Sequence, residues 1–173
     1  FNHSLKSNDL MILNDSKKLS KIKRKVAIKL ILQLQRNKQL SFALGLASVE
    51  EIDRLNILQA TILSMKRAII KLNLKKGTLI VDGNINLDLK NFTCKNIIKG
   101  DQLSTSIATA SIIAKVHRDK YMAKIDRQYP HFNWSSNAGY GTTEHLKKIQ
   151  QKGISIHHRK SFKPIKSFIH NNI

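Results

Sequence analysis

The sequence has little that could cross-link it or hold it in a membrane. It has one cysteine, Cys94, and two prolines among 173 residues. One cysteine cannot form an internal disulfide, and such a chain is typical of reducing compartments, so a cytoplasmic location is expected. Lys, Gln or Asn interrupts each apolar stretch well short of the ~20 residues that a membrane span needs. The sequence therefore excludes a disulfide scaffold and a transmembrane protein.

Acidic residues are also scarce. The chain has 11 Asp and Glu against 31 Lys and Arg, which gives a formal net charge of +20. Such a charge attracts polyanions, and the phosphate backbone of nucleic acid is the commonest of these, so nucleic acid is the expected partner. A bias toward Lys, Ile and Asn, as A+T-rich codons produce, is the alternative explanation. Because the charge is spread along the chain, a disordered basic arm is disfavoured.

The spacing of apolar residues predicts helices that alternate with short strands. Ser20 is expected to cap a helix over 21–38, and Ser48 with Glu51 has the capping-box pattern that begins another helix. Further helices are expected over 57–72, 105–128, 143–152 and after Pro164, and strands over 41–47, 78–81 and 96–98. This alternation indicates the α/β class. No linker or repeat divides the chain, so one domain over residues 1–173 is expected.

Two aspartates stand out because acidic residues are so few. Asp82 and Asp101 each follow a predicted strand and border a glycine, where a carboxylate can face a cleft beyond the sheet. In a protein that binds phosphate, such carboxylates suit Mg²⁺ or Mn²⁺, hard cations that prefer oxygen ligands. A two-metal site would orient water and stabilise the leaving oxygen. An ordinary surface turn remains the alternative, since Asp-Gly is a common turn dipeptide.

Other candidate residues have simpler explanations. The run 157–160, His-His-Arg-Lys, is better explained as a solvated basic segment near phosphate than as a metal site, because adjacent residues do not converge on one ion. Tyr140 lies in a glycine-rich turn and could stack on a sugar or base, or could fill a packing gap. Cys94 lacks any zinc-like spacing. The sequence has no glycine-rich phosphate loop of the Walker or Rossmann type.

Eight ordered segments of the sequence share a pattern with one known family. They are LNDSKKL at 13–19, EIDRLNILQAT at 51–61, VDGN at 81–84, KGD at 99–101, SIATASIIAKV at 106–116, RD at 118–119, GYGT at 139–142 and HRKSF at 158–162. Through these eight segments the chain resembles ribonuclease HII, the bacterial type 2 ribonuclease H, over nearly its whole length. So many long matches in order make coincidence implausible.

The resemblance implies a fold and an activity. The expected fold is α/β and ribonuclease H-like, a mixed sheet flanked by helices. The expected enzyme is an endoribonuclease that hydrolyses the RNA strand of RNA–DNA hybrids, and single ribonucleotides embedded in DNA duplexes, leaving 5′-phosphomonoesters. Four carboxylates bind two divalent ions, Mg²⁺ or Mn²⁺, in that family, and Asp82 and Asp101 match the third and fourth. A monomer that contacts no membrane is expected.

The resemblance also implies residues that bind the substrate. Tyr140 resembles the family tyrosine that packs on the sugars at the RNA–DNA junction, where the 2′-hydroxyl distinguishes RNA from DNA. The other candidates are phosphate contacts and hydroxyl contacts: Lys17, Lys18, Lys115, Arg159 and Lys160 for phosphates, and Ser104 and Ser106 as hydroxyls.

The sequence departs from the family pattern in two places. The family begins with a strand that carries an Asp-Glu pair followed by Gly-Arg-Gly, and this chain contains neither, so we expect a sheet without its first strands and a chain that is inactive alone. Asn137 and Ala138 stand where the family usually has His and Lys.

There are two alternatives to an endoribonuclease. One is a non-catalytic, basic nucleic-acid-binding domain derived from a decayed enzyme. The other is a plain α/β domain with a lysine-rich surface.

Overall fold

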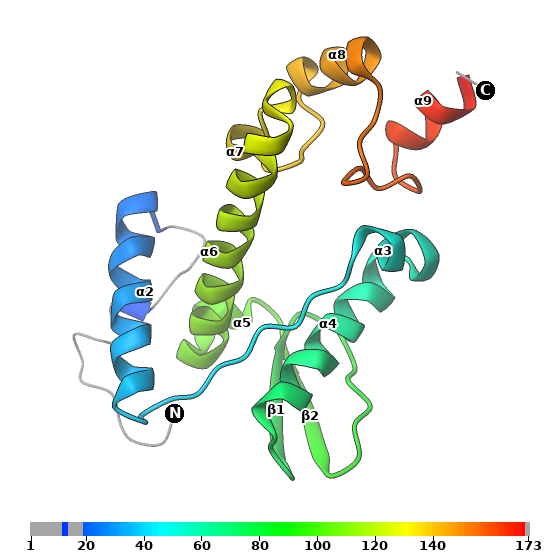
Figure 1. Cartoon of the computed structure of the whole chain (residues 1–173). Coiled ribbons are helices and arrows are strands. Elements are labelled where there is room, and N and C mark those ends of the chain that lie inside the picture. The colour runs from blue at the N-terminus through cyan, green and yellow to red at the C-terminus, as the bar shows by residue number, and fades with distance from the viewer. Residues whose placement is uncertain (1–11, 14–18, 172–173) are drawn as a thin grey trace. The chain divides into compact units, whose positions relative to one another are not determined.

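The computed structural model describes residues 12–13 and 19–171, which form helices and one small sheet (Figure 1). In chain order the elements are α2 (Lys21–Arg36), α3 (Val49–Leu55), α4 (Ile57–Leu72), β1 (Gly77–Asp82), β2 (Phe92–Ile97), α5 (Gly100–Leu103), α6 (Thr105–Gln128), the 3₁₀ helix η1 (Pro130–Phe132), α7 (Trp134–Asn137), α8 (Thr143–Lys152) and α9 (Ile165–Asn171). The two strands are parallel, with Gly77 opposite Phe92 and Asp82 opposite Ile97. This arrangement confirms the predicted α/β class. No helix in the described part is long and apolar enough to span a membrane.

The capping residues predicted from the sequence begin their helices. The Ser20 hydroxyl accepts a hydrogen bond from the Lys23 N–H at 3.3 Å, at the start of α2. Ser48 and Glu51 form the complete capping box of α3, in which each side chain accepts from the other residue's backbone N–H. Because such caps satisfy N–H groups that the helix itself cannot, the predicted helix starts are confirmed.

The segment 41–47, predicted to be a strand, is irregular in the structure. Side chains of α4 take the place of a neighbouring strand as partners of its backbone. Lys71 Nζ donates to the Leu44 carbonyl at 2.9 Å, and Arg67 Nη1 donates to the Leu46 carbonyl at 2.7 Å. The apolar run therefore packs as an extended segment along a helix, and the strand prediction is wrong.

The prediction from the sequence also misplaced one strand and did not include two short helices. The strand predicted over 96–98 begins earlier, at Phe92, because Phe92–Cys94 pair with the first half of β1. Helices α5 and α7 have four residues each. Four residues are too few for a helical apolar period, so the pattern could not reveal them.

The described chain divides into two compact units, each with its own apolar core. The first contains the described residues up to Leu46 and Ser64–Val116, and the second contains Ala47–Leu63 and the described residues from His117 onward. Buried residues of the first core come from α2 and α6 and their neighbours: Leu13, Ala27, Ile31, Leu34, Leu40, Ile112 and Ile113. Those of the second are Ile125, Phe132, Trp134, Ile149 and Ile165. The predicted single domain stays a prediction.

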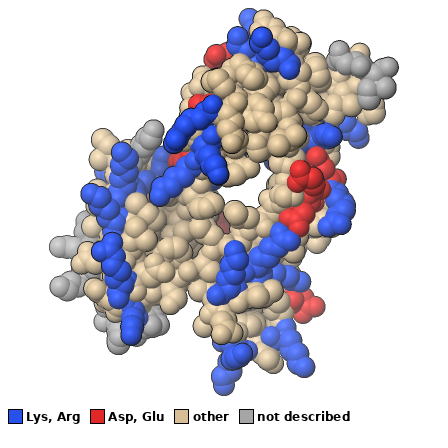
Figure 2. All heavy atoms as spheres, viewed as in Figure 1, with Lys and Arg blue, Asp and Glu red and all other residues tan. Residues whose placement is uncertain are grey.

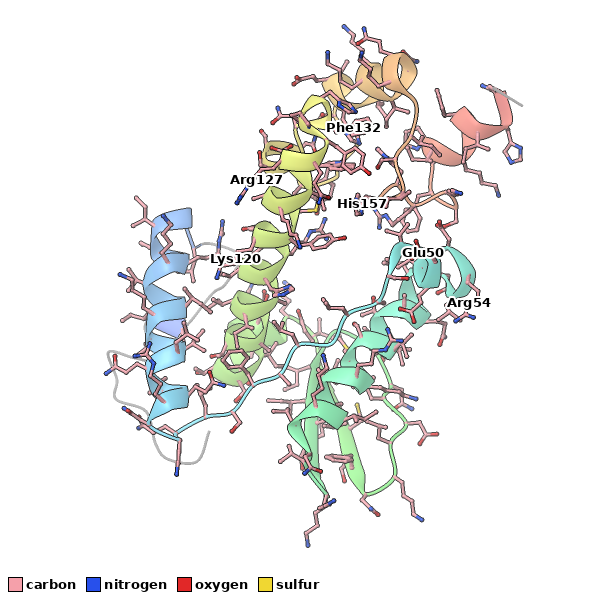
Figure 3. The ribbon with its side chains drawn as sticks, viewed as in Figure 1. Glu50, Arg54, Lys120, Arg127, Phe132 and His157 are labelled. Carbon is pink, nitrogen blue, oxygen red and sulfur yellow. The ribbon has the colours of Figure 1, made fainter. Side chains whose placement is uncertain are left out.

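Aromatic rings and histidines pack together in the second unit. Phe132, labelled with His157 in Figure 3, stacks on Trp134 with ring centroids 4.9 Å apart. The buried His158 ring lies edge-on to Phe132 at 4.7 Å. Its Nδ1 accepts a hydrogen bond from the Ser155 N–H at 2.9 Å, which requires an unprotonated Nδ1. The neutral form of His158 therefore holds the start of the basic segment against the core.

Folding stability is expected to fall on mild acidification because of His158. Burial, and next the charge of His145, lower the pKa of His158 to about 4 from its ordinary 6.5. Between these two pKa values the unfolded chain binds a proton that the folded chain does not. The contribution of neutral His158 to folding stability is therefore complete above pH 6.5 and is lost as the pH falls. We expect the free energy of unfolding to fall by about 2 kcal/mol between pH 7 and pH 5.

Thermal unfolding at both pH values measures this loss. His158→Asn, whose side-chain oxygen can accept the Ser155 N–H, should remove most of the pH dependence. His170→Asn, an exposed histidine of α9, should leave it unchanged. An equal pH dependence in all three proteins would contradict the role given to His158.

Candidate functional site

The two predicted carboxylates meet where β1 ends and α5 begins. Asp82 is the last residue of β1 and is half-buried, and Asp101 lies in the first turn of α5 with 1% of its surface exposed. The Gly100 N–H, next to Asp101 in the chain, donates to Asp82 Oδ1 at 2.8 Å. The structure therefore places the start of α5, which carries Asp101, against Asp82 at the carboxyl end of a parallel strand, which is where α/β proteins usually bind ligands.

Gly100 lets the start of α5 pack closely against the ends of β1 and β2. A Cβ at this position would lie 2.5 Å from Ile107 Cδ1 and 3.3 Å from Ile97 Cβ. It would lie 3.5 Å from Asp82 Cα, which is an ordinary contact distance. The end of the flexible Ile107 side chain could move aside, so the tightest fixed neighbour would be Ile97 at the end of β2. The small size of Gly100 thus helps α5 to pack against the ends of both strands.

The donor chemistry of this pair fits a divalent cation. Carboxylate oxygens are the preferred ligands of Mg²⁺ and Mn²⁺. The bond from Gly100 occupies one lone-pair site of Asp82, and a carboxylate has about four. In the part of the chain that the structure describes, no three His, Cys, Asp or Glu side chains gather where they could hold a metal ion. Asp82 and Asp101 therefore fit as part of an ion site, and their role stays a prediction.

The remaining candidates of the first unit do not form one cluster. Ser104 ends α5, where its N–H donates to the Gly100 carbonyl at 2.8 Å, so it lies beside the carboxylate pair. Ser106 is exposed in the first turn of α6, and Lys115 is half-buried on the same helix. Nine positions along a helix amount to a half-turn beyond two full turns, so Ser106 and Lys115 lie on opposite faces of α6. The predicted contacts Lys17 and Lys18 lie outside the described residues.

Tyr140 is exposed on the second unit, as a ligand-stacking residue must be. Its exposed fraction is 69%, so it does not fill a packing gap, and that alternative is wrong. Asn137 builds the turn before it: its Oδ1 accepts from the Gly139 N–H at 2.8 Å, and its Nδ2 donates to the Phe132 carbonyl at 2.7 Å. Asn137, one of the two departures from the family pattern, thus has a structural role in presenting Tyr140.

Arg118 lies beside Tyr140, and sequence reasoning gave it no role. Its Nη2 donates to the Ala138 carbonyl at 2.8 Å, and its guanidinium carbon lies 5.9 Å from the centre of the Tyr140 ring. Arg159, a predicted phosphate contact, has its guanidinium carbon 4.0 Å from the centre of the Phe162 ring. The sequence signal for Arg118 was its place in the matched Arg118-Asp119 pair.

Asp53 holds the basic segment, residues 157–160, in place. No sequence pattern had indicated this role. Its carboxylate accepts from the Lys160 N–H at 2.9 Å, the Ser161 N–H at 3.0 Å and the Ser161 hydroxyl at 2.6 Å. Burial opposes ionisation of Asp53, but the bonds from Ser161 and Lys160 outweigh it, so the pKa of Asp53 is lowered. Lys160 itself is exposed. A carboxylate of α3 thus fixes the backbone that carries two predicted phosphate contacts.

Positive charge is spread over the visible surface. Figure 2 shows Lys and Arg side chains spread over the visible face, with few Asp and Glu among them. Figure 3 labels Lys120 and Arg127 on α6 and Arg54 on α3, all of them exposed. A surface of this kind attracts the phosphate backbone of nucleic acid without sequence preference.

The chain is similar to known proteins over almost its full length. The sequence model of the family Ribonuclease HII matches residues 5–165. A ribonuclease HII of Pelagibacter ubique is 47% identical over 94% of this chain and 85% of its own length. One from the Wolbachia of Drosophila simulans is 50% identical over 88% of this chain and 74% of its own length. One from Macrococcus caseolyticus is 50% identical over 91% of this chain and 57% of its own length.

These matches confirm the family that the motif series indicated. The small parallel sheet flanked by helices agrees with the ribonuclease H-like fold of that family. The family model matches most of the chain, and the relatives are close to half identical to it. The chain belongs to the ribonuclease HII family of endoribonucleases.

Proposed function

We propose that this chain takes part in hydrolysis of the RNA strand of RNA–DNA hybrids and of single ribonucleotides embedded in DNA. The hydrogen bond from Gly100 to Asp82 Oδ1 carries the proposal, because it places the residue that precedes Asp101 against the Asp82 carboxylate in a chain of this family. The net charge of +20 supports a nucleic-acid substrate. Hydrolysis adds water at phosphorus and breaks the bond to the O3′ atom, which leaves a 5′-phosphate and a 3′-hydroxyl.

Asp82 and Asp101 would hold divalent ions, Mg²⁺ or Mn²⁺, at the carboxyl end of β1. When bound, such ions polarise the phosphoryl oxygens and make water a stronger nucleophile. The chain's own contribution is to keep the Asp82 carboxylate oriented through the Gly100 N–H and to keep Asp101 in a buried position. Burial strengthens the attraction of a carboxylate for a cation, because the surroundings screen it less than water does.

Two carboxylates alone are too few for two ions. A pair of ions about 4 Å apart needs oxygen ligands on both sides of the pair. In the described residues no third acidic, histidine or cysteine side chain joins Asp82 and Asp101. We therefore expect these two residues by themselves to bind one hydrated ion weakly and to support little turnover, until further carboxylates complete the set.

The test is cleavage of a DNA duplex that contains one ribonucleotide, with Mg²⁺ or Mn²⁺ present. This chain is compared with the same chain preceded by the upstream sequence of its own reading frame, and an all-DNA duplex serves as the control. Cleavage at the ribonucleotide by the extended chain is the expected result. Absence of cleavage by both proteins would overturn the proposed activity.

A non-catalytic nucleic-acid-binding domain is the second candidate, favoured by the high positive charge. It predicts binding that weakens steeply with salt and is indifferent to divalent ions and to the 2′-hydroxyl. Binding of the ribonucleotide-containing duplex and the all-DNA duplex, measured at one salt concentration, separates the two candidates. Clear preference for the ribonucleotide contradicts this second candidate, and equal binding supports it.

A further inference from the structure

We propose that the outer face of α2 binds the phosphate backbone of a nucleic-acid duplex through three cations, Lys25, Lys29 and Arg36. These three residues form the α2 row. The inference rests on the proposed function, because the duplex is its substrate. No residue of α2 belongs to the motif series or to the predicted substrate contacts. The α2 row is therefore a binding surface in addition to the predicted site.

The α2 row lies on the face of the helix that points away from the core. On the other face, Ala27, Ile31 and Leu34 are buried in the core of the first unit. An α-helix turns by about 100° per residue, so the three cations fall within about 40° of one another and about half a turn from the buried face. All three are exposed. Figure 2 shows Lys and Arg side chains one above another over α2, at the left of the view.

No acidic residue of α2 balances the charge of the row. The helix contains no Asp or Glu, and within the described residues no carboxylate pairs with a member of the row. Helix α4 also lacks acidic residues, but its Arg67 and Lys71 donate to backbone carbonyls of the segment 41–47. In the part of the chain that the structure describes, the cations of the α2 row are thus available to a ligand.

The α2 row has a length that suits a run of phosphates. Because a helix rises 1.5 Å per residue, Lys29 lies about 6 Å beyond Lys25 along the axis, and Arg36 lies about 10 Å further on. Each strand of a duplex carries a phosphate about every 3.4 Å along its axis. Lysine is a flexible point charge and needs no fixed geometry to contact a phosphate. A nucleic-acid strand can therefore contact all three cations, whereas a small anion would contact one.

An acidic segment of another protein is the competing partner. Ile22 is 76% exposed and Val26 is 49% exposed, and both lie beside the row near the start of α2. An acidic segment with apolar residues would cover these side chains as well as pair with the cations. Protein interfaces are depleted in lysine, however, and two of the three cations are lysines. Together with the net charge of +20, this composition favours nucleic acid.

The test measures binding of a fluorescent RNA–DNA hybrid and of an all-DNA duplex of equal length, without divalent ions, at several salt concentrations. A short poly-glutamate peptide represents the competing partner. The row variant replaces the three cations with glutamine: Lys25→Gln, Lys29→Gln and Arg36→Gln. The control variant replaces three exposed lysines that precede the strands of the same unit: Lys75→Gln, Lys76→Gln and Lys90→Gln. Both variants lower the net charge equally, and thermal unfolding checks that each keeps its fold.

The row variant should bind both duplexes on the order of a hundredfold more weakly at about 0.1 M salt. Its plot of log affinity against log salt should be less steep by about 2 to 3, since each lost phosphate contact removes about 0.9 from the slope. The loss should be equal for the hybrid and for DNA, because phosphate contacts carry no information on sugar or base. Lys25→Arg combined with Lys29→Arg keeps the charge and should keep the binding. The control variant should bind nearly like the parent.

Two results would overturn the inference and leave the proposed function intact. One is an equal loss of affinity in the row variant and the control variant, which would mean that only the overall charge matters. The other is poly-glutamate binding that is tighter than duplex binding at the same salt and is lost only in the row variant, which would assign this face to an acidic protein segment. A parent chain that binds neither duplex refutes the proposed function and this inference together.

Discussion

Replacing Asp82 with asparagine is expected to reduce cleavage about a thousandfold in a protein that cleaves, and to leave hybrid binding nearly unchanged. Asparagine keeps an oxygen that can accept the Gly100 N–H, so the contact between β1 and α5 survives. It loses the negative charge and one oxygen ligand. Metal ions contribute several kcal/mol of transition-state stabilisation, and each 1.4 kcal/mol is about a factor of ten in rate. Single-turnover cleavage of a duplex with one ribonucleotide measures the loss.

Asp88→Asn is the matched control. Asp88 is an exposed aspartate between β1 and β2, so the substitution changes the net charge equally and should leave cleavage unchanged. A second readout does not need turnover: Mn²⁺ should raise the melting temperature of the parent and of Asp88→Asn more than that of Asp82→Asn. Full turnover by Asp82→Asn, or an equal shift by Mn²⁺ in all three proteins, would refute the metal role of Asp82.

Replacing Gly45 with alanine is expected to destabilise the fold by about 3 kcal/mol, or roughly 10 °C in melting temperature. A Cβ on Gly45 would overlap the Ser64 carbonyl oxygen and lie 2.7 Å from the Ala68 backbone nitrogen. Both atoms belong to the backbone of α4, which cannot move aside as a flexible side chain can. The segment before α3 would have to lift away from α4. Its carbonyl bonds to Arg67 and Lys71 would then lengthen.

Gly141→Ala is the control for this change. A Cβ on Gly141 would lie 3.8 Å from Leu146 Cδ2 and 4.0 Å from Pro164 Cδ, which are ordinary contacts. Its backbone lies outside the left-handed region, so alanine is tolerated there and should change stability by less than about 0.5 kcal/mol. Chemical denaturation compares both variants with the parent. An equal effect of the two substitutions would mean that the close approach of Gly45 to α4 is not needed.

Much of the local structure could be predicted from the sequence. Helices over 57–72, 105–128 and 143–152 appear at the predicted bounds, and Ser20 and Ser48 cap as expected. These features depend on residues within a few positions of one another. An amphipathic period and a capping hydroxyl act through neighbouring backbone groups, so they can be recognised without knowing the fold.

The candidate site was predicted only in part. Asp82 and Asp101 could be found because acidic residues beside glycine at strand ends are few in this chain. The contact that joins them, from Gly100 to Asp82, could not be predicted, because it depends on α5, a helix too short to show a period. The prediction of a strand over 41–47 failed for a related reason. An apolar run indicates burial, and it does not indicate whether a strand or a helix will cover it.

The sequence by itself determined the family, the helix bounds, the excess of positive charge and the choice of Asp82 and Asp101 as candidate metal ligands. Only the tertiary structure decided which distant groups meet. Asp53 bonds to residues 107 and 108 positions later, and Arg118 lies beside Tyr140. Short-range patterns describe how each segment folds against its neighbours in sequence. Contacts across a hundred residues follow from how those segments pack, which no local pattern specifies.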